Sequence, residues 1–417
     1  MTRRRLLFTV MSGLLAFSGE ARAQCLALEG GQLALPGARP TVGTLVIQAA
    51  TITAAGDGVI VPAGCTRVSM TGKVITAGLI DGSSSLGVDE ISLEPSTRED
   101  DAGGELPIRA AFRVEEGYNP RSSLIPVARL GGVTSAVVMP TGGLISGQAA
   151  WVDLRGVTQA DVVERAPLAM VANLSDNAGA SLRTLRELLD DARQFITQQT
   201  AWERGQSRAF GVSRVELMAL RPLLERKIPL VVGADRASDI EALLRFAAEQ
   251  KIRVVIRGAA EGHLLSQQLA KAGVGVLIDP LVYGPGGFDQ VRGRRENAAR
   301  LQAAGVTVAI GAFSEHNLRK LRQLAGNAVR DGMPWEAALD SITGAPARLF
   351  GMQGYGTLSA ASVANLAVWS GDPLELSTQL EQLYIHGRRI ELKSRQSELL
   401  QRYRKLPGTP RPALSLP

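Results

Sequence analysis

The chain is poor in histidine and in aromatic residues. Its 417 residues include three histidines, and Phe, Trp and Tyr together make up 4% of the sequence. So few aromatic side chains leave little surface for stacking on bases or sugars. Three histidines likewise leave few imidazole ligands for a metal ion. The composition therefore argues against a nucleic-acid-stacking surface and against a histidine-rich metal centre.

The chain also lacks a strong excess of one charge. Its formal net charge is +6, but residues 1–23 contribute four arginines and one glutamate. Without them, 46 basic residues become 42 and 40 acidic residues become 39, which gives +3. That excess is too small to predict nucleic-acid binding. A 45% hydrophobic content over this length is enough for one large domain or two, with a full core.

Residues 1–23 have the pattern of a secretory signal. Three arginines at 3–5 precede an apolar stretch at 6–17, and Ala21-Arg22-Ala23 forms a small-residue cleavage site. We expect cleavage after Ala23 and a periplasmic or secreted mature protein. A membrane anchor is the alternative, but the apolar stretch is shorter than the ~20 residues that a span needs. The paired arginines also fit twin-arginine export, so both export routes stay open.

Cys25 and Cys65 are the only cysteines, and both come early in the expected mature chain. An oxidising compartment permits a disulfide between them. Two buried thiols are the alternative. From the compartment and the count, we predict the bridge.

Strands and helices alternate from residue 81 onward. Strands are expected near 228–232, 252–256, 274–278 and 306–310, with helices at 239–250, 264–272 and 297–304 between them. Residues 141–148 are rich in glycine and are interpreted as a loop. Residues 24–80 are instead rich in short β patterns and turns. The alternation predicts an α/β fold built on a (β/α) barrel.

Ordered motifs at the two ends of this region resemble those of the amidohydrolase superfamily, in particular a bacterial subgroup related to imidazolonepropionases. They are Gly78-Leu79-Ile80-Asp81, Gly344-Ala345-Pro346 and Gly371-Asp372-Pro373, and the resemblance covers roughly residues 40–390. It implies a (β/α)8 TIM-like barrel with a small β-sandwich from both chain ends. The expected units are the signal at 1–23, the sandwich at 24–80 and 350–392, the barrel at 81–349, and a basic helix with a Pro-rich tail at 393–417.

The same resemblance implies where metal ligands should lie. The family uses two histidines after strand 1, a Lys or Glu after strand 4, histidines after strands 5 and 6, and an aspartate after strand 8. No Lys or Glu follows the expected fourth strand, at residues 169–173. The other matching positions are occupied by Ser83, Ser85, Gly233, Asp235, Arg257 and Phe313. Of these six, Asp235 alone has a side chain that zinc commonly binds. We therefore expect no metal and no other cofactor, with zinc only if the protein is an active hydrolase.

Two short segments offer acid/base groups for such an active protein. His263 with Glu261 follows the expected strand 6, and His316 with Glu315 follows strand 8. Both should lie at the carboxyl ends of the strands, where barrel enzymes place their chemistry. The alternative is ordinary polar composition at helix starts. A nucleophilic pair of Ser83 with a histidine lacks an elbow motif and an orienting acid.

The sequence thus predicts an exported amidohydrolase-like pseudoenzyme that has lost its metal site. It would act as a non-catalytic partner, of an active amidohydrolase paralogue or of a second copy of itself, or as a barrel that binds a small molecule. No nucleic acid and no membrane span after signal cleavage are expected. The alternative is an active hydrolase of C–N bonds, in cyclic amides or small peptides, with a divergent site.

Overall fold

The computed structural model describes residues 25–404, except 104–106, 175–176, 201–203, 205–207 and 285. The predicted signal at 1–23 and the Pro-rich tail after residue 404 lie outside the described residues. Over the described part of the chain, none of the helices combines the length and the apolar character that a membrane crossing requires.

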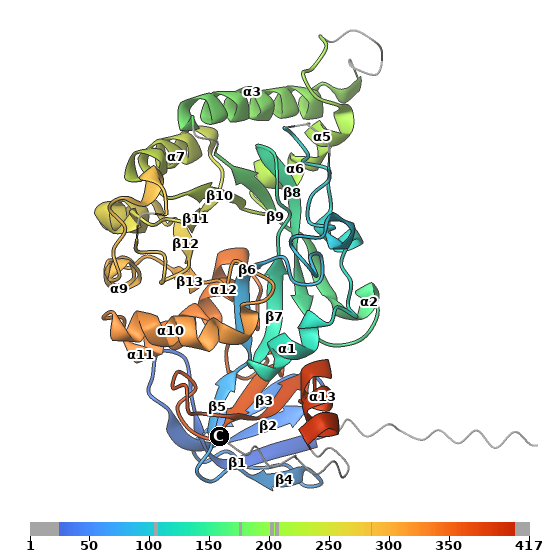
Figure 1. The fold of residues 1–417 in the computed structure, drawn as a ribbon, viewed down its shortest axis with the longest axis vertical. Helices are drawn as coiled ribbons and strands as arrows, with labels where there is room; N and C mark the ends of the chain where they lie inside the picture. Colours follow the sequence, from blue (N-terminus) through green and yellow to red (C-terminus); the bar gives the residue numbers. More distant parts are fainter. Residues whose placement is uncertain are drawn as a thin grey trace, which may run out of the picture.

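The two ends of the chain meet in one eight-stranded sheet, sheet A, at the bottom of Figure 1. The N-terminal part supplies β1 (Cys25–Leu33), β2 (Thr41–Gln48), β3 (Thr51–Gly56), β4 (Thr66–Ser69) and β5 (Val74–Ala77). The C-terminal part supplies β14 (Leu366–Trp369), β15 (Leu380–Ile385) and β16 (Arg388–Ile390). β5 joins the two parts, because it pairs with both β1 and β14. The expected sharing of one β unit by both chain ends is therefore seen, whereas its description as a two-layer sandwich stays a prediction.

The second sheet, sheet B, forms a nearly closed barrel. Its eight strands lie in sequence order: β6 (Leu79–Ser84), β7 (Val133–Val138), β8 (Ile145–Asp153), β9 (Val163–Asn173), β10 (Leu230–Ala234), β11 (Val254–Gly258), β12 (Gly275–Ile278) and β13 (Val308–Ile310). The seam between the edge strands β6 and β13 is bridged just beyond β13, where the Phe313 amide donates to the Ser83 carbonyl at 3.2 Å.

Helices cover the outside of the barrel, as Figure 1 shows. They are α1 (Leu124–Leu130), α2 (Gln159–Val162), α3 (Ala178–Thr197), α5 (Arg214–Ala219), α6 (Arg221–Leu224), α7 (Ala237–Gln250), α8 (Ser266–Ala272), α9 (Asn297–Ala303), α10 (Leu321–Arg330) and α11 (Trp335–Ser341). α12 (Gly344–Phe350) packs instead against the interior cluster of the barrel, to which Ala345, Ala347 and Phe350 belong. A last helix, α13 (Arg395–Arg404), follows sheet A and buries none of its side chains.

One strand departs from the expected (β/α)8 pattern. β8 runs antiparallel to both of its neighbours, β7 and β9, while the other neighbouring strands of sheet B are parallel. β8 begins inside the glycine-rich segment that the sequence assigns to a loop, so that assignment is wrong from Ile145 onward. A hairpin needs only a short connection, whereas a parallel crossover needs a dozen or more residues. The short connections on both sides of β8 therefore produce an antiparallel insertion.

The side chains of the barrel strands alternate between two hydrophobic clusters, as the period of a strand requires. On β11, Val254 and Ile256 belong to the layer between strands and helices, and Val255 belongs to the barrel interior. Val231, Leu277 and Ala309 belong to the same interior cluster on β10, β12 and β13. The next inward residue on each strand therefore lies at the carboxyl end, where the barrel opens.

The predicted disulfide between Cys25 and Cys65 is present in the structure. Cys25 opens β1, and Cys65 immediately precedes β4, which pairs with β1 in parallel. The bridge closes a loop with a sequence separation of 40 residues. It therefore joins two neighbouring strands of sheet A at their starts.

Candidate functional site

The inward rows of the barrel strands end in a group of side chains at the carboxyl ends of the strands. Two residues past Val171, Val255 and Leu277 come Asn173, Arg257 and Asp279. These three line one cavity of about 400 Å³. Its further lining residues are Leu174, Gly233, Ala234, Asp235, Asp239, Gly258, Val282, Asp289, Gln290 and Phe313.

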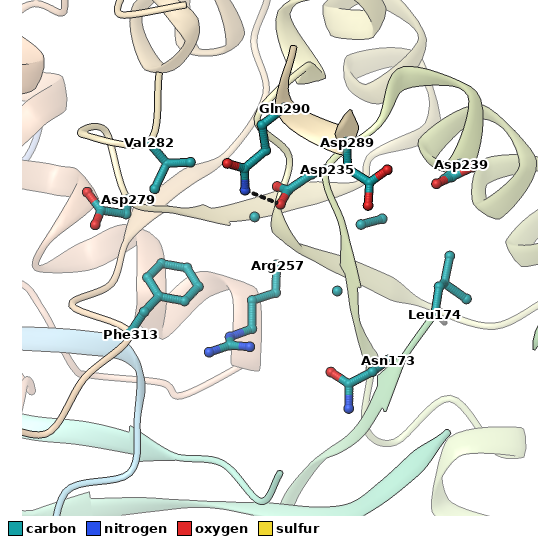
Figure 2. A pocket seen from close by; sticks show the side chains of 13 residues that line it. Asn173, Leu174, Asp235, Asp239, Arg257, Asp279, Val282, Asp289, Gln290 and Phe313 are labelled. Carbon is teal, nitrogen blue, oxygen red and sulfur yellow. Dashed lines mark hydrogen bonds between the residues drawn. The ribbon is translucent and has the colours of Figure 1, made fainter. Parts of the chain in front are cut away.

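A second cavity of about 400 Å³ adjoins the first. It lies against Ser83, Ser84, Ser85, Met139 and residues 140–143. Asn173, Arg257 and Phe313 line both cavities, so the two spaces are lobes of one barrel mouth divided by these side chains. Figure 2 shows Arg257 projecting into the mouth between Phe313 and Asn173.

Arg257 is the centre of this arrangement. Its Nε donates to Ser83 Oγ at 2.9 Å, and its guanidinium carbon lies 4.7 Å from the centre of the Phe313 ring. Burial lowers the pKa of Arg257, while Asp81 and Asp235 act in the opposite direction. An arginine side chain stays protonated under ordinary conditions. The structure thus brings together three of the expected metal-ligand positions, with a cation among them.

The other expected ligand positions take part in the surrounding loops. Asp235 Oδ1 accepts from the Ala260 amide at 3.1 Å, and its Oδ2 accepts from Gln290 Nε2 at 2.8 Å. Gly233 contributes backbone alone. Ser85 Oγ donates to Glu315 Oε2 at 3.0 Å. Both carboxylate oxygens of Asp235 are therefore occupied by N–H donors.

The four candidate acid/base residues fall into two separate networks. Glu315 is buried and accepts from Ser85 and from Ser92, and it pairs with the exposed His316 at 3.3 Å. Glu261 accepts from the Ala237 amide at the start of α7 and from the Arg292 amide, both at 3.0 Å. Among the described residues, no hydrogen bond or ion pair joins these two networks.

His263 is buried and holds its position through its backbone. Its amide donates to Asn297 Oδ1 at 2.9 Å, and within the described structure neither ring nitrogen has a hydrogen-bond partner. Burial, followed by the nearby Arg300 and Arg294, lowers its pKa. The imidazole is therefore neutral near pH 7 and packs as a core side chain.

A buried carboxyl at the barrel seam was not singled out by the sequence. Asp81 on β6 is fully buried, and its Oδ1 accepts from the Ala312 amide at 2.7 Å beyond β13. Its Oδ2 has no partner in the described structure. Burial raises the pKa of Asp81 to about 8, although the Ala312 and Ser83 amides and Arg257 oppose that shift. Asp81 is therefore largely protonated at neutral pH.

Asp153, Glu164 and His386 form a second polar cluster, at the end of β8 that faces sheet A. One ligand atom from each lies within 4.8 Å of the others, a spacing that could hold a metal ion. However, Asp153 Oδ2 already accepts from Tyr355 Oη and Asn365 Nδ2, both at 3.2 Å. A metal ion bound to Asp153 Oδ2 would lie close to the hydrogens that Tyr355 and Asn365 donate to the same oxygen, which is unfavourable. The cluster therefore fits a hydrogen-bonded anchor better than a metal centre.

Comparisons with known proteins bear on the fold and the family. No protein-family model matches the chain. The amidohydrolase tasK of Hapsidospora irregularis is 23% identical over 362 residues, which are 76% of this chain and 36% of that protein. The chain thus spans about a third of the length of that curated relative.

Solved structures of similar fold are all below 25% identity and therefore bear on the fold alone. An amidohydrolase from Thermotoga maritima MSB8 has a TM-score of 0.79 and 22% identity, covering 88% of this chain and 99% of that one. A prolidase in complex with N-methylphosphonate-L-proline has a TM-score of 0.55 and 14% identity, covering 88% and 100%. Atrazine chlorohydrolase TrzN from Arthrobacter aurescens TC1, a mutant with zinc and atraton, has a TM-score of 0.52 and 15% identity, covering 87% and 94%.

Proposed function

We propose that this chain is an exported member of the amidohydrolase superfamily, to which its 23% identical relative belongs by name, and that its barrel binds a small ligand at its mouth and does not hydrolyse it. The single observation that carries the proposal is the hydrogen bond from Arg257 Nε to Ser83 Oγ. It places a fixed positive charge among the positions where the superfamily holds a metal cation.

The donor set at the mouth argues against a metal ion there. Zinc binds thiolate, imidazole and carboxylate side chains, usually three or four together. Of the replaced positions, Asp235 alone offers such a group, and both its oxygens accept hydrogen bonds. A guanidinium nearby also repels a divalent cation, since like charges at short range are unfavourable. No hydrolytic step through a metal follows from these residues.

Export is part of the proposal and depends on residues 1–23. Their basic, apolar and small-residue order has the pattern of a cleaved signal. The Cys25–Cys65 bridge is compatible with an oxidising compartment, because such bonds are rare where thiols are kept reduced. Intact-mass measurement on the exported protein tests this part: the chain should begin at Gln24.

The central test is metal content measured together with activity. The mature protein is purified, incubated with zinc, passed through a desalting column and analysed by plasma mass spectrometry. The same sample is screened against small amides, cyclic amides and dipeptides. We expect well below one metal per chain and no turnover.

About one zinc per chain with hydrolysis of a small amide would instead support the alternative, an active C–N hydrolase. The acid/base groups would then have to come from His263, Glu261, His316 and Glu315. Because Glu261 and Glu315 lie in different networks, single substitutions at each would show which network is used.

A further inference from the structure

The guanidinium of Arg257 has Asp81 and Asp235 in its surroundings but forms no direct ion pair with a described carboxylate. Its Nε donates to Ser83, but neither terminal nitrogen donates to a described residue, and no described carboxylate forms an ion pair with it. Phe313 covers one face of the guanidinium. A half-buried charge without an ionic partner is costly, so it favours an anion supplied from outside the chain.

The chemistry of the mouth selects among anions. A guanidinium presents a planar fork of N–H groups that matches the two oxygens of a carboxylate. The first lobe also contains four aspartates: Asp235, Asp239, Asp279 and Asp289. Their negative charge disfavours a phosphate dianion and favours a positive group on the same ligand.

These aspartates differ in how far the protein engages them: Asp239 and Asp279 each accept one hydrogen bond on Oδ1, from Ser238 Oγ at 3.3 Å and from the Leu281 amide at 2.8 Å. Asp289 forms an ion pair with Arg236, and both oxygens of Asp235 accept hydrogen bonds. Asp239 and Asp279 form no ion pair with a described residue. An ammonium group in this lobe would therefore find a carboxylate that is not neutralised by the protein.

The remaining walls of the mouth are apolar or neutral. Leu174, Val282 and Phe313 line the first lobe. Asn173 uses its Nδ2 to donate to Gly143 and Ser146, which leaves its Oδ1 as an acceptor. A cavity of about 400 Å³ is within the range of small-molecule sites.

We infer that the mouth binds a small zwitterion of the amino-acid class, with its carboxylate on Arg257 and its ammonium group in the aspartate lobe. An apolar side chain would pack against Leu174, Val282 and Phe313. The inference rests on the proposed function, a barrel that binds a ligand without hydrolysing it. It goes further by assigning a chemical class and an orientation to that ligand.

Isothermal titration of the mature protein with three matched probes tests the assignment. L-leucine carries both charges, L-leucinamide lacks the carboxylate, and 4-methylpentanoate lacks the ammonium group. We expect leucine to bind, and each one-charge analogue to bind about 10-fold to 100-fold more weakly, since a hydrogen bond to a charged group contributes about 1.5–3 kcal/mol.

Substitutions separate the two ends of the ligand. Arg257→Met should abolish the preference for leucine over leucinamide. Asp279→Asn should weaken leucine binding and leave 4-methylpentanoate unchanged. Arg253→Gln is the matched control, because Arg253 immediately precedes β11 at the opposite end of the barrel and should not affect binding.

Equal affinity for leucine and 4-methylpentanoate would overturn the zwitterion assignment, and so would leucine binding that survives Arg257→Met. No leucine binding, in a protein that also lacks metal and turnover, would overturn the ligand class and leave the non-hydrolytic barrel standing. Stoichiometric zinc with turnover would overturn the proposed function itself.

Discussion

Arg257 and Ser83 lie on opposite sides of the barrel mouth, 174 residues apart in sequence, and are joined by a hydrogen bond of 2.9 Å. Each occupies a position where the sequence resemblance predicts a metal ligand. Arg257 continues the row of inward-facing residues on β11. Ser83 lies on β6, where the pairing with β7 shifts register between Asp81 and Ser84. The contact therefore links β6 and β11 directly across the mouth.

This contact predicts that restoring histidines after β6 will not restore a metal site. In the double variant Ser83→His, Ser85→His, the Arg257 guanidinium stays beside the new imidazoles and repels a divalent cation. We expect zinc retention after desalting to equal that of the wild type. Adding Arg257→His removes the charge and supplies a ligand, so the triple variant should retain more zinc. One tightly bound zinc in the double variant would contradict the prediction.

The buried carboxyl of Asp81 predicts how stability depends on pH. Its pKa is about 8 in the folded protein against 3.8 for an unperturbed aspartate, so the folded state keeps a proton that the unfolded chain releases. The contribution of Asp81 to the free energy of unfolding should therefore be most favourable near or below pH 4 and fall as the pH rises toward 8. The slope is at most about 1.4 kcal/mol per pH unit.

Asp81→Asn tests this because an amide can accept from Ala312 but cannot ionise. Urea denaturation should give similar stabilities for wild type and variant near pH 4, and a more stable variant at pH 8. Asp57→Asn, at an exposed turn residue, removes the same formal charge and is the control. A stability difference that is the same at both pH values would rule out the buried ionisation as its cause.

Sequence patterns predict those parts of the fold that depend on local order. The strands near 228–232, 252–256, 274–278 and 306–310 correspond to β10, β11, β12 and β13, since each is a short apolar run. β8 could not be recognised, because its start contains Gly147 at φ +136 and lies in a segment with turn-like composition. The antiparallel direction depends on pairing with β7 and β9, which a one-dimensional pattern does not contain.

The residues of the site also divide into those that local sequence order predicts and those that depend on long-range pairing. Period-two alternation from Val255 places Arg257 inside the mouth, so its location is readable from the sequence. Its partner is not, because the bond to Ser83 spans the barrel. The pairing of His386 with Asp153 spans 233 residues and likewise leaves no local signal. The polar contacts that the sequence does not predict in these two clusters therefore join residues that lie far apart in the chain.

The Cys25–Cys65 bridge predicts a measurable loss of stability when it is removed. A closed loop of this length restricts the unfolded chain and contributes about 3–4 kcal/mol, less any strain. The double variant Cys25→Ser, Cys65→Ser should unfold at lower urea concentration and with a steeper slope, because its unfolded chain is less restricted and exposes more surface. Reduced wild type is the control and should behave alike. Free thiols that titrate fully in the exported protein would show that the bridge does not form.

The last prediction concerns Asp153, a fully buried carboxylate between the barrel and sheet A. Its Oδ1 accepts from Ser135 at 2.6 Å and from Trp151 at 3.3 Å. Its Oδ2 accepts from Tyr355, Asn365 and His386, the last at 2.6 Å. One side chain therefore joins β7 and β8 of the barrel to the segment before β14 and to the turn between β15 and β16.

Asp153→Asn keeps the shape but turns an N–H group toward donors, so several buried N–H and O–H groups lose their acceptor. We expect the free energy of unfolding to fall by about 3–5 kcal/mol. Glu164→Gln is the matched control, since Glu164 is half-buried in the same cluster, and its effect should stay below about 1 kcal/mol. A cycle that adds His386→Ala should give a coupling of about 1–3 kcal/mol with Asp153. Additive effects of the Asp153 and His386 substitutions would show that the two ends of the chain are held to the barrel by packing rather than by this carboxylate.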